Sequence, residues 1–246
     1  MTQSVSYNLT TTRDAIITRA LRIVGAVGEG ETPTAAAITA GAEALNDLTK
    51  EWETDGMPLW SLTTYGPMTL VLSQAAYAIG VGAAGLNTVA PLRVTQAWYR
   101  NNNRDTPINI VTRDSYNLMQ AKSVTGTPTL FWYNPPGGIA ATEAVGTVTV
   151  YPTPDTYAAA NDTVYFTGIK PFMDFDASTD VPDFPQYWYN AVKWGLADQL
   201  AYEYGVGLAE RSMISKKALF HKQAALDGGA EEGSMFLLPT SREERK

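Results

Sequence analysis

The sequence contains no cysteine and only one histidine, His221. Without cysteine the chain can form no disulfide, no thiolate metal site and no cysteine nucleophile. No serine lies in a nucleophile-elbow motif, so a serine–histidine–aspartate arrangement has no support. His221 stands in a lysine-rich helical segment, and we expect it on a solvated surface or at an interface. We therefore predict that the protein is not an enzyme and uses no cofactor or metal.

Long apolar runs and positive charge are also scarce. No run of about 18 apolar residues is present, so we expect no membrane-spanning helix. The first residues lack a basic segment and an apolar run, and we expect no signal peptide. The net charge of −7 and the pI of about 4.8 disfavour tight binding to nucleic acid, which needs a positive surface. An acidic wall would still let DNA slide past, because it repels phosphate.

Apolar residues at helical spacing are present near the N-terminus. They recur from Ile16 to Val24 after Thr11 and Asp14, a pattern that is typical of a helix and its N-terminal cap. A second helix is predicted from Thr32 as N-cap and Pro33 in the first turn. Because the connection is short, residues 1–57 are expected to form a helical hairpin.

The period changes to two in residues 58–181, where apolar residues alternate with threonine or tyrosine between turn motifs. A short helix capped by Thr112 interrupts this pattern. We predict an inserted domain that resembles an antiparallel β-sandwich. The expected strands are 68–72, 76–79, 94–99, 108–111, 129–133, 147–151 and 163–167.

An aromatic helix follows in residues 182–205, with Asp183 as the expected N-cap and Pro185 in the first turn. Its rings are too numerous to be hidden in one small bundle. Two apolar stripes indicate contacts on two sides: one stripe should seal a helical bundle, and the other should face the β-domain or another subunit. The first stripe contains Trp188, Val192, Leu196 and Leu200, and the second contains Tyr187, Ala191, Trp194, Ala197 and Ala201.

A last helix is expected from Leu208 to Leu226, followed by a polar tail. We predict an α+β fold in which residues 1–57 and 182–228 form a four-helix bundle around the inserted β-domain. Residues 229–246 are expected to be an extended C-terminal arm. Its apolar residues Met235, Phe236, Leu237 and Leu238 allow two interpretations: a disordered end, or a peptide arm that becomes ordered on a partner.

Two further groups of residues could bind a ligand. The first, Asp174, Asp176, Asp180 and Asp183, is either a structural loop or a cation site, although the glycine and glutamate of a calcium loop are missing. The second, Trp98, Tyr99, Trp132 and Tyr133, could stack on sugars, but aromatic residues of this kind more often pack a sheet.

Several segments, in this order, resemble the head-to-tail adaptor proteins of tailed bacteriophages, which include the tail tubular A and packaged-DNA stabilisation proteins. They are TRDAIITRALRIVGAVGEGETP, LNDLTKEWETDGMPLW, PLRVTQAWYRNNNRDTPINIVTRDSYNLM, TGTPTLFWYNP, VTVYPTPD and FPQYWYNAVKWGLADQLAYEYG. Together they span most of residues 12–205. The resemblance implies a helical bundle with an inserted β-domain.

The resemblance also implies a virion protein of the neck or tail, made in the host cytoplasm. Twelve copies would form a ring around the DNA channel. The portal protein would lie on one side, and a tail, nozzle or tail-terminator protein on the other. The arm at Met235–Leu238 would bind the portal, and DNA would pass without sequence-specific contacts. The alternatives are a carbohydrate- or receptor-binding tail component and a cell-wall hydrolase, for which no catalytic carboxylate pair is evident.

Overall fold

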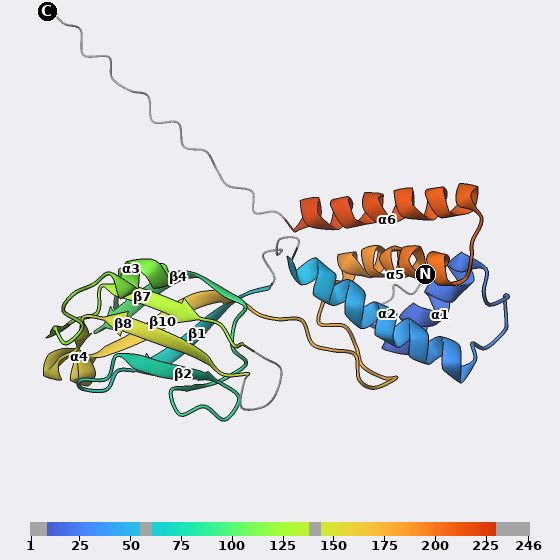
Figure 1. Cartoon of the computed structure of the whole chain (residues 1–246). Coiled ribbons are helices and arrows are strands. Elements are labelled where there is room, and N and C mark those ends of the chain that lie inside the picture. Colours follow the sequence, from blue (N-terminus) through green and yellow to red (C-terminus); the bar gives the residue numbers. More distant parts are fainter. Residues whose placement is uncertain (1–8, 55–60, 138–143, 230–246) are drawn as a thin grey trace, which may run out of the picture.

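The computed structural model describes residues 9–54, 61–137 and 144–229 and shows a mixed α+β protein. The long helices and the strands lie in separate halves of the molecule, and two short α-helices, residues 113–117 and 156–161, lie with the strands (Figure 1). The helices are α1 (Arg13–Val24), α2 (Ala35–Thr54), α3 (Arg113–Asn117), α4 (Thr156–Asn161), the 3₁₀ helix η2 (Gln186–Trp188), α5 (Tyr189–Glu203) and α6 (Leu208–Gly228). The strands are β1 (Leu62–Thr69), β2 (Ala76–Gly80), β3 (Leu86–Asn87), β4 (Arg93–Asn101), β5 (Arg104–Ile110), β6 (Thr125–Gly126), β7 (Leu130–Asn134), β8 (Gly146–Tyr151), β9 (Thr153–Pro154) and β10 (Asp162–Ile169).

The two N-terminal helices begin slightly later than the sequence predicts. The N-cap of α1 is Thr12 rather than Thr11, because it is the hydroxyl of Thr12 that accepts a hydrogen bond from the amide of Ala15. Likewise Thr34, not Thr32, accepts from the amide of Ala37 at the start of α2. In both helices the capping threonine lies three residues before the backbone amide that donates to it. That amide has no carbonyl partner within the helix.

The β-region, residues 61–169, contains one eight-stranded sheet that curls almost into a barrel. Its order is β1-β10-β4-β5-β7-β8-β2-β3. The strands that we expected in a sandwich join into this single sheet because β5 and β7 pair in parallel, at Asn109 with Leu130 and Ile110 with Phe131. β1 begins at Leu62, before the expected start at residue 68, and its threonine-rich first half pairs with the end of β10.

Large side chains from distant strands fill the interior of this sheet. Phe166 on β10 stacks on Tyr65 of β1 at a ring separation of 5.2 Å and contacts Phe131 of β7 at 5.4 Å. Phe131 and Phe166 are fully buried, and each such ring contributes roughly 1.5–3 kcal/mol by leaving water. The β-region therefore has a hydrophobic core of its own.

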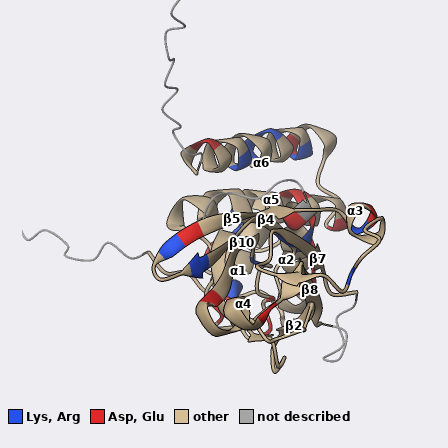
Figure 2. Cartoon of the chain, turned by 90° about the vertical axis from the view of Figure 1, so that its left-hand side faces the viewer, with Lys and Arg blue, Asp and Glu red and all other residues tan. Residues whose placement is uncertain are grey.

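The helical region consists of α1, α2, η2, α5, α6 and the return segment, which we define as residues 170–185. α5 lies at its centre, with α1 and α2 on one side and α6 on the other (Figures 1 and 2). Small residues allow this close packing: a Cβ added at Gly195 would lie 3.0 Å from the Trp52 ring and 3.2 Å from Leu48. α6 contributes Ile214, Ala218 and Ala225 to the buried side.

Candidate assembly surface

The first stripe of the aromatic helix lies inside the helical region. Trp188, Val192, Leu196 and Leu200 are all buried in its core. Trp188 contacts Trp52 of α2 at a ring separation of 5.5 Å. This stripe therefore joins α5 to the N-terminal helices.

Trp194 of the second stripe packs against α6 within the same chain. Trp194 is half-buried, and its ring stacks on His221 of α6 at 6.0 Å. The ammonium group of Lys217 lies 4.7 Å from the Trp194 ring centre. His221 is accordingly half-buried at the interface of two helices, the second of the two positions expected for it, because α6 folds back over α5 and brings Trp194 against it.

Three tyrosines of the aromatic segment remain exposed, which confirms that its rings are not all hidden. They are Tyr187, Tyr202 and Tyr204. The guanidinium group of Arg211 lies 3.7 Å from the ring centre of Tyr202. Tyr187 lies just before α5, Tyr202 and Tyr204 lie at its end, and Tyr202 meets α6 through Arg211.

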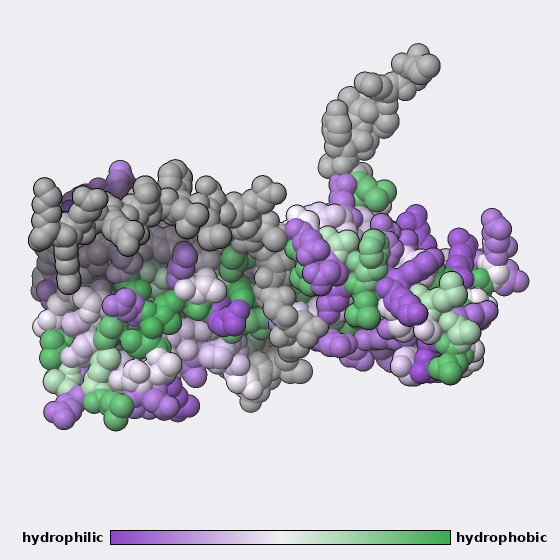
Figure 3. All heavy atoms as spheres, turned by 90° about the horizontal axis from the view of Figure 1, so that it is seen from above, coloured by the Kyte–Doolittle hydropathy of each residue, from purple (hydrophilic) through white to green (hydrophobic). Residues whose placement is uncertain are grey.

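The exposed side of α6 carries several of the large apolar side chains that are exposed in the described chain. We call the surface of Leu208, Met213, Lys216, Leu219 and Phe220 the α6 outer face. Its four apolar members are between 63% and 79% exposed. Figure 3, which views the molecule from the side of α6, shows hydrophobic residues among hydrophilic ones on the helical half. Sequence periodicity did not locate this face, since α6 has apolar residues on both sides; the structure assigns Ile214, Ala218 and Ala225 to the buried one.

The aspartate-rich loop is part of the return segment and has a structural role. Asp180 accepts hydrogen bonds from the amides of Asp176 and Ala177 at 2.9 and 2.7 Å. Asp174 pairs with Lys50 at 2.9 Å, and Asp183 pairs with Lys170. Within the described ranges, no group of three or more histidine, aspartate or glutamate side chains is arranged to hold a metal ion.

The predicted N-cap role of Asp183 is wrong. The chain enters α5 through the 3₁₀ helix η2, and neither helix has a side-chain cap. Asp183 instead binds Lys170, at the other end of the return segment. The helix start is fixed by packing, with Phe184 and Trp188 in the core on either side of it.

The return segment is held on α2 by hydrogen bonds as well as by packing. Glu53 accepts from the amide of Phe172 at 2.6 Å, and Asn46 accepts from the amide of Phe175 at 2.9 Å. Partial burial acts to lower the pKa of Lys50, but Asp174 and Glu53 outweigh it, so the pKa lies above its ordinary value of 10.5. Three phenylalanines of this segment, Phe172, Phe175 and Phe184, enter the helical core.

The four aromatic residues considered for sugar binding mostly contact the protein itself. Tyr99 packs on the β core, and Trp132 stacks on Tyr116 at 5.2 Å. The hydroxyl of Tyr133 donates to the carbonyl of Pro91 at 2.5 Å, and burial raises the pKa of Tyr133.

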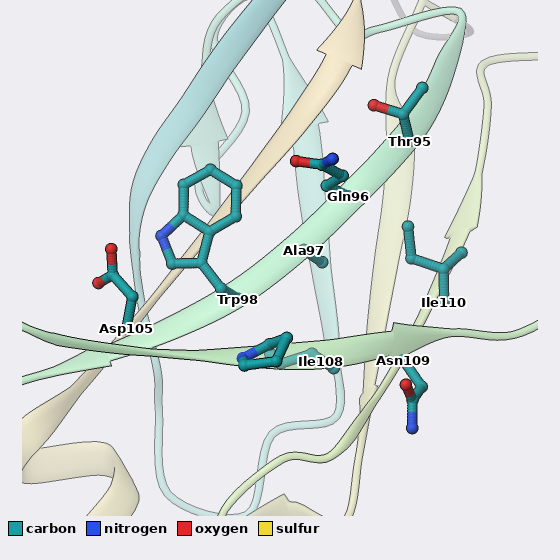
Figure 4. Close-up of a pocket in the computed structure, with 9 residues that line it drawn as sticks. Thr95, Gln96, Ala97, Trp98, Asp105, Ile108, Asn109 and Ile110 are labelled. Atoms are coloured by element: carbon teal, nitrogen blue, oxygen red, sulfur yellow. The ribbon is translucent and has the colours of Figure 1, made fainter. Parts of the chain in front are cut away.

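Trp98 is the member of this group that lines an open hollow. The hollow, about 520 Å³ in volume, lies over β4 and β5 (Figure 4). The Trp98 ring stacks on Tyr165 at 6.1 Å, and the Arg100 guanidinium covers the same tyrosine at 4.7 Å. Arg100 binds Asp105 through two hydrogen bonds, which lower the pKa of the Asp105 carboxyl. This aromatic and charged cluster stabilises the outside of the sheet.

The predicted portal-binding arm, Met235, Phe236, Leu237 and Leu238, lies outside the described residues. Across the part of the chain that the structure describes, no helix is long and apolar enough to cross a membrane.

Comparison with known proteins identifies a family. No curated protein matches the chain. The family model of the SU10 adaptor protein matches residues 11–236, which is nearly the whole sequence. Proteins of this kind are structural head–tail adaptors of bacteriophages and not enzymes, and membership implies a virion component that contacts other head and tail proteins. With both halves of the structure inside the matched range, the chain belongs to the SU10 adaptor protein family.

Proposed function

We propose that the protein is the subunit of a twelve-membered ring that joins the portal to the tail and continues the DNA channel. The family match supports a structural role in the neck of the virion. The structural observation that carries the ring is the α6 outer face, where four large apolar side chains stand in solvent on one helix. Large apolar side chains gathered on one exposed helix face mark a site of interaction with another protein.

The charge of the chain suits the proposed channel. The net charge is −7, and lysine and arginine together number 18 against 25 acidic residues. A wall with this balance repels phosphate, so DNA would move along it without sequence-specific contacts. Salt would weaken the repulsion, because mobile ions screen exposed charges.

The proposed partners are the portal protein on one side of the ring and a tail, nozzle or tail-terminator protein on the other. We assign portal binding to the arm, through Met235, Phe236, Leu237 and Leu238. An arm that becomes ordered on its partner loses a few kcal/mol of the interaction energy in ordering. Many arms bound at once overcome this loss, because each one raises the effective concentration of the next.

Deletion of residues 231–246 tests the arm. We expect portal binding in a pull-down assay to be lost while the circular dichroism spectrum stays unchanged. A matched control deletes only residues 239–246 and keeps the apolar cluster; it should bind the portal as the full chain does. Undiminished portal binding by the longer deletion contradicts the assignment.

Electron microscopy of the full chain, alone and mixed with the portal, tests the ring. We expect twelve-fold rings in the mixture, stacked on the portal. Portal particles that carry isolated subunits, or rings of another symmetry, contradict the proposed stoichiometry.

A further inference from the structure

We propose that the α6 outer face of one copy binds an acidic face of α2 on the next copy. We call the exposed surface of Ala36, Thr39, Glu43 and Asp47 the α2 outer face. This inference rests on the proposed ring and deepens it by naming the two surfaces that meet around it.

Charge complementarity is the first observation. α6 contains four lysine and arginine residues and two acidic residues, whereas α2 contains four acidic residues and one lysine. Lys216 and Lys217 lie between Met213 and Phe220 on α6, and Glu43 and Asp47 are one helical turn apart on α2. In the described part of the chain Glu43, Asp47 and Lys216 take part in no ion pair. Opposite charges across an interface fix its register and exclude wrong partners.

Surface shape is the second observation. Ala36 and Thr39 give the first half of the α2 outer face only small side chains, on which the rings and chains of Phe220 and Met213 can lie flat. Seven residues separate Met213 from Phe220, which is about 10 Å along a helix. Eleven separate Ala36 from Asp47, or about 16 Å, so the α2 outer face is long enough to take both apolar residues and the lysines between them.

The positions of the two faces favour a second copy as the occupant. α6 and α2 lie on different sides of the central α5 (Figures 1 and 2). Two different faces on different sides give a head-to-tail contact, which each added copy can repeat until a ring closes. Elsewhere, copies of a chain with net charge −7 repel one another, which disfavours other pairings.

The contact should be weak between two isolated copies. A stable interface buries about 800 Å² on each partner, and a single helix face provides less. We therefore expect the dimer of two copies to be detectable only when a covalent bond traps it or when the ring closes.

Because the sequence has no cysteine, engineered cysteine pairs give a direct test in the full chain. Two variants on α6, Lys216→Cys and Lys217→Cys, are each mixed with Glu43→Cys or Asp47→Cys under mild oxidation, with and without portal. A disulfide requires Cα atoms about 4.4–6.8 Å apart. We expect covalent dimers in at least one mixture, at no less than ten times the yield of Lys216→Cys mixed with the exposed control Asp114→Cys on α3.

Charge reversal provides the matched control for these pairs. In each cross-linking chain only the remaining charge is reversed: K217E with Lys216→Cys, K216E with Lys217→Cys, D47K with Glu43→Cys and E43K with Asp47→Cys. Each reversal should lower the yield about tenfold. Mixing the two reversed chains should restore it. Restored cross-linking would indicate a charge contact. If a reversal instead damaged the fold of its own chain, mixing with the other reversed chain would not restore the yield.

The outcomes distinguish the paired faces from the ring itself. Rings in electron micrographs without any α2–α6 disulfide overturn the pairing and leave the ring in place. Disulfides that join Lys216→Cys chains to each other indicate a symmetric contact and also overturn the pairing. The expected disulfides without rings support the pairing and count against the ring. If neither disulfides nor rings form, with portal present, both proposals are wrong.

Discussion

The β-region and the helical region solve the problem of burying apolar surface in different ways. The β-region curls its sheet around Tyr65, Phe131 and Phe166, and its exposed apolar residues, such as Val81 and Leu118, are scattered over turns and strands. Single exposed residues of this kind are normal. The helical region gathers exposed apolar side chains on one face of α6.

The origin of the core residues also differs. The β core comes from one continuous stretch of chain, residues 61–169, whereas the helical core combines α1 and α2 with α5, α6 and three phenylalanines of the return segment. The β-region can therefore be stable without the helices, while the helical core is incomplete until the chain has returned from the sheet. The following variants test this contrast.

The largest expected effect is in the sheet. Phe131→Ala removes a fully buried ring and should lower the free energy of unfolding by about 3–5 kcal/mol. Hydrogen exchange measured by mass spectrometry should accelerate in β7, β8 and β10 but not in α5. The same change at the exposed Phe220 should alter stability by about 0.5 kcal/mol or less. Equal acceleration in α5 would mean that the two regions unfold together.

A smaller effect is expected in the return segment. Phe184 contacts Phe172 and Phe175 edge-on, at ring separations of 5.4 and 6.2 Å. Phe184→Ala should cost about 3 kcal/mol and increase hydrogen exchange in α1 and α2, with the sheet unchanged. Met173→Ala, in the exposed part of the same segment, is the control and should have little effect. Faster exchange in the β strands after the Phe184 change would refute the independence of the sheet.

The smallest effect should appear at alkaline pH. The raised pKa of Lys50 means that the folded protein holds this proton more tightly than the unfolded chain does. The contribution of protonated Lys50 to stability is therefore complete below pH 10.5 and is lost as the pH rises through the folded-state pKa. The pair is partly exposed and screened by water, so the loss should stay below about 1 kcal/mol. Urea unfolding of the wild type and of Lys50→Met, compared across this pH range, measures the loss as a shrinking difference in their free energies of unfolding. A difference in favour of the wild type that grows with pH contradicts the assignment.

Much of the secondary structure could be predicted because its signals are local. The cap at Thr112 is confirmed by its hydrogen bond from the amide of Ser115, and the last helix begins at Leu208 as expected. The first half of β1 was missed because its threonines carry no apolar alternation, and it is fixed only by pairing with β10. The short helix α4, capped by Asp155, was missed because its six residues are too few for a periodic pattern.

The position of α5 could not be predicted for a different reason. Periodicity shows that a helix has apolar residues on two sides, but not which element covers each side. The sequence predicts that Trp194 faces the β-region or a neighbour, whereas in the fold its ring stacks on His221 of α6. The exposed side of α6 could not be predicted for the same reason. Both sides of that helix carry apolar residues, and only the packing against α5 shows which side is buried.

The central position of α5 has a consequence for the timing of synthesis. The ribosome makes α1 and α2 first and then the whole sheet, and more than a hundred residues separate Thr54 from Tyr189. At about 5–20 residues per second, the first hairpin waits roughly seven to thirty seconds with its apolar side uncovered. α6 emerges later still and carries both core residues and the surface proposed for joining neighbours, so a nascent chain gains that surface only as its own interior closes. The order of the helices along the chain thus delays assembly until folding can finish.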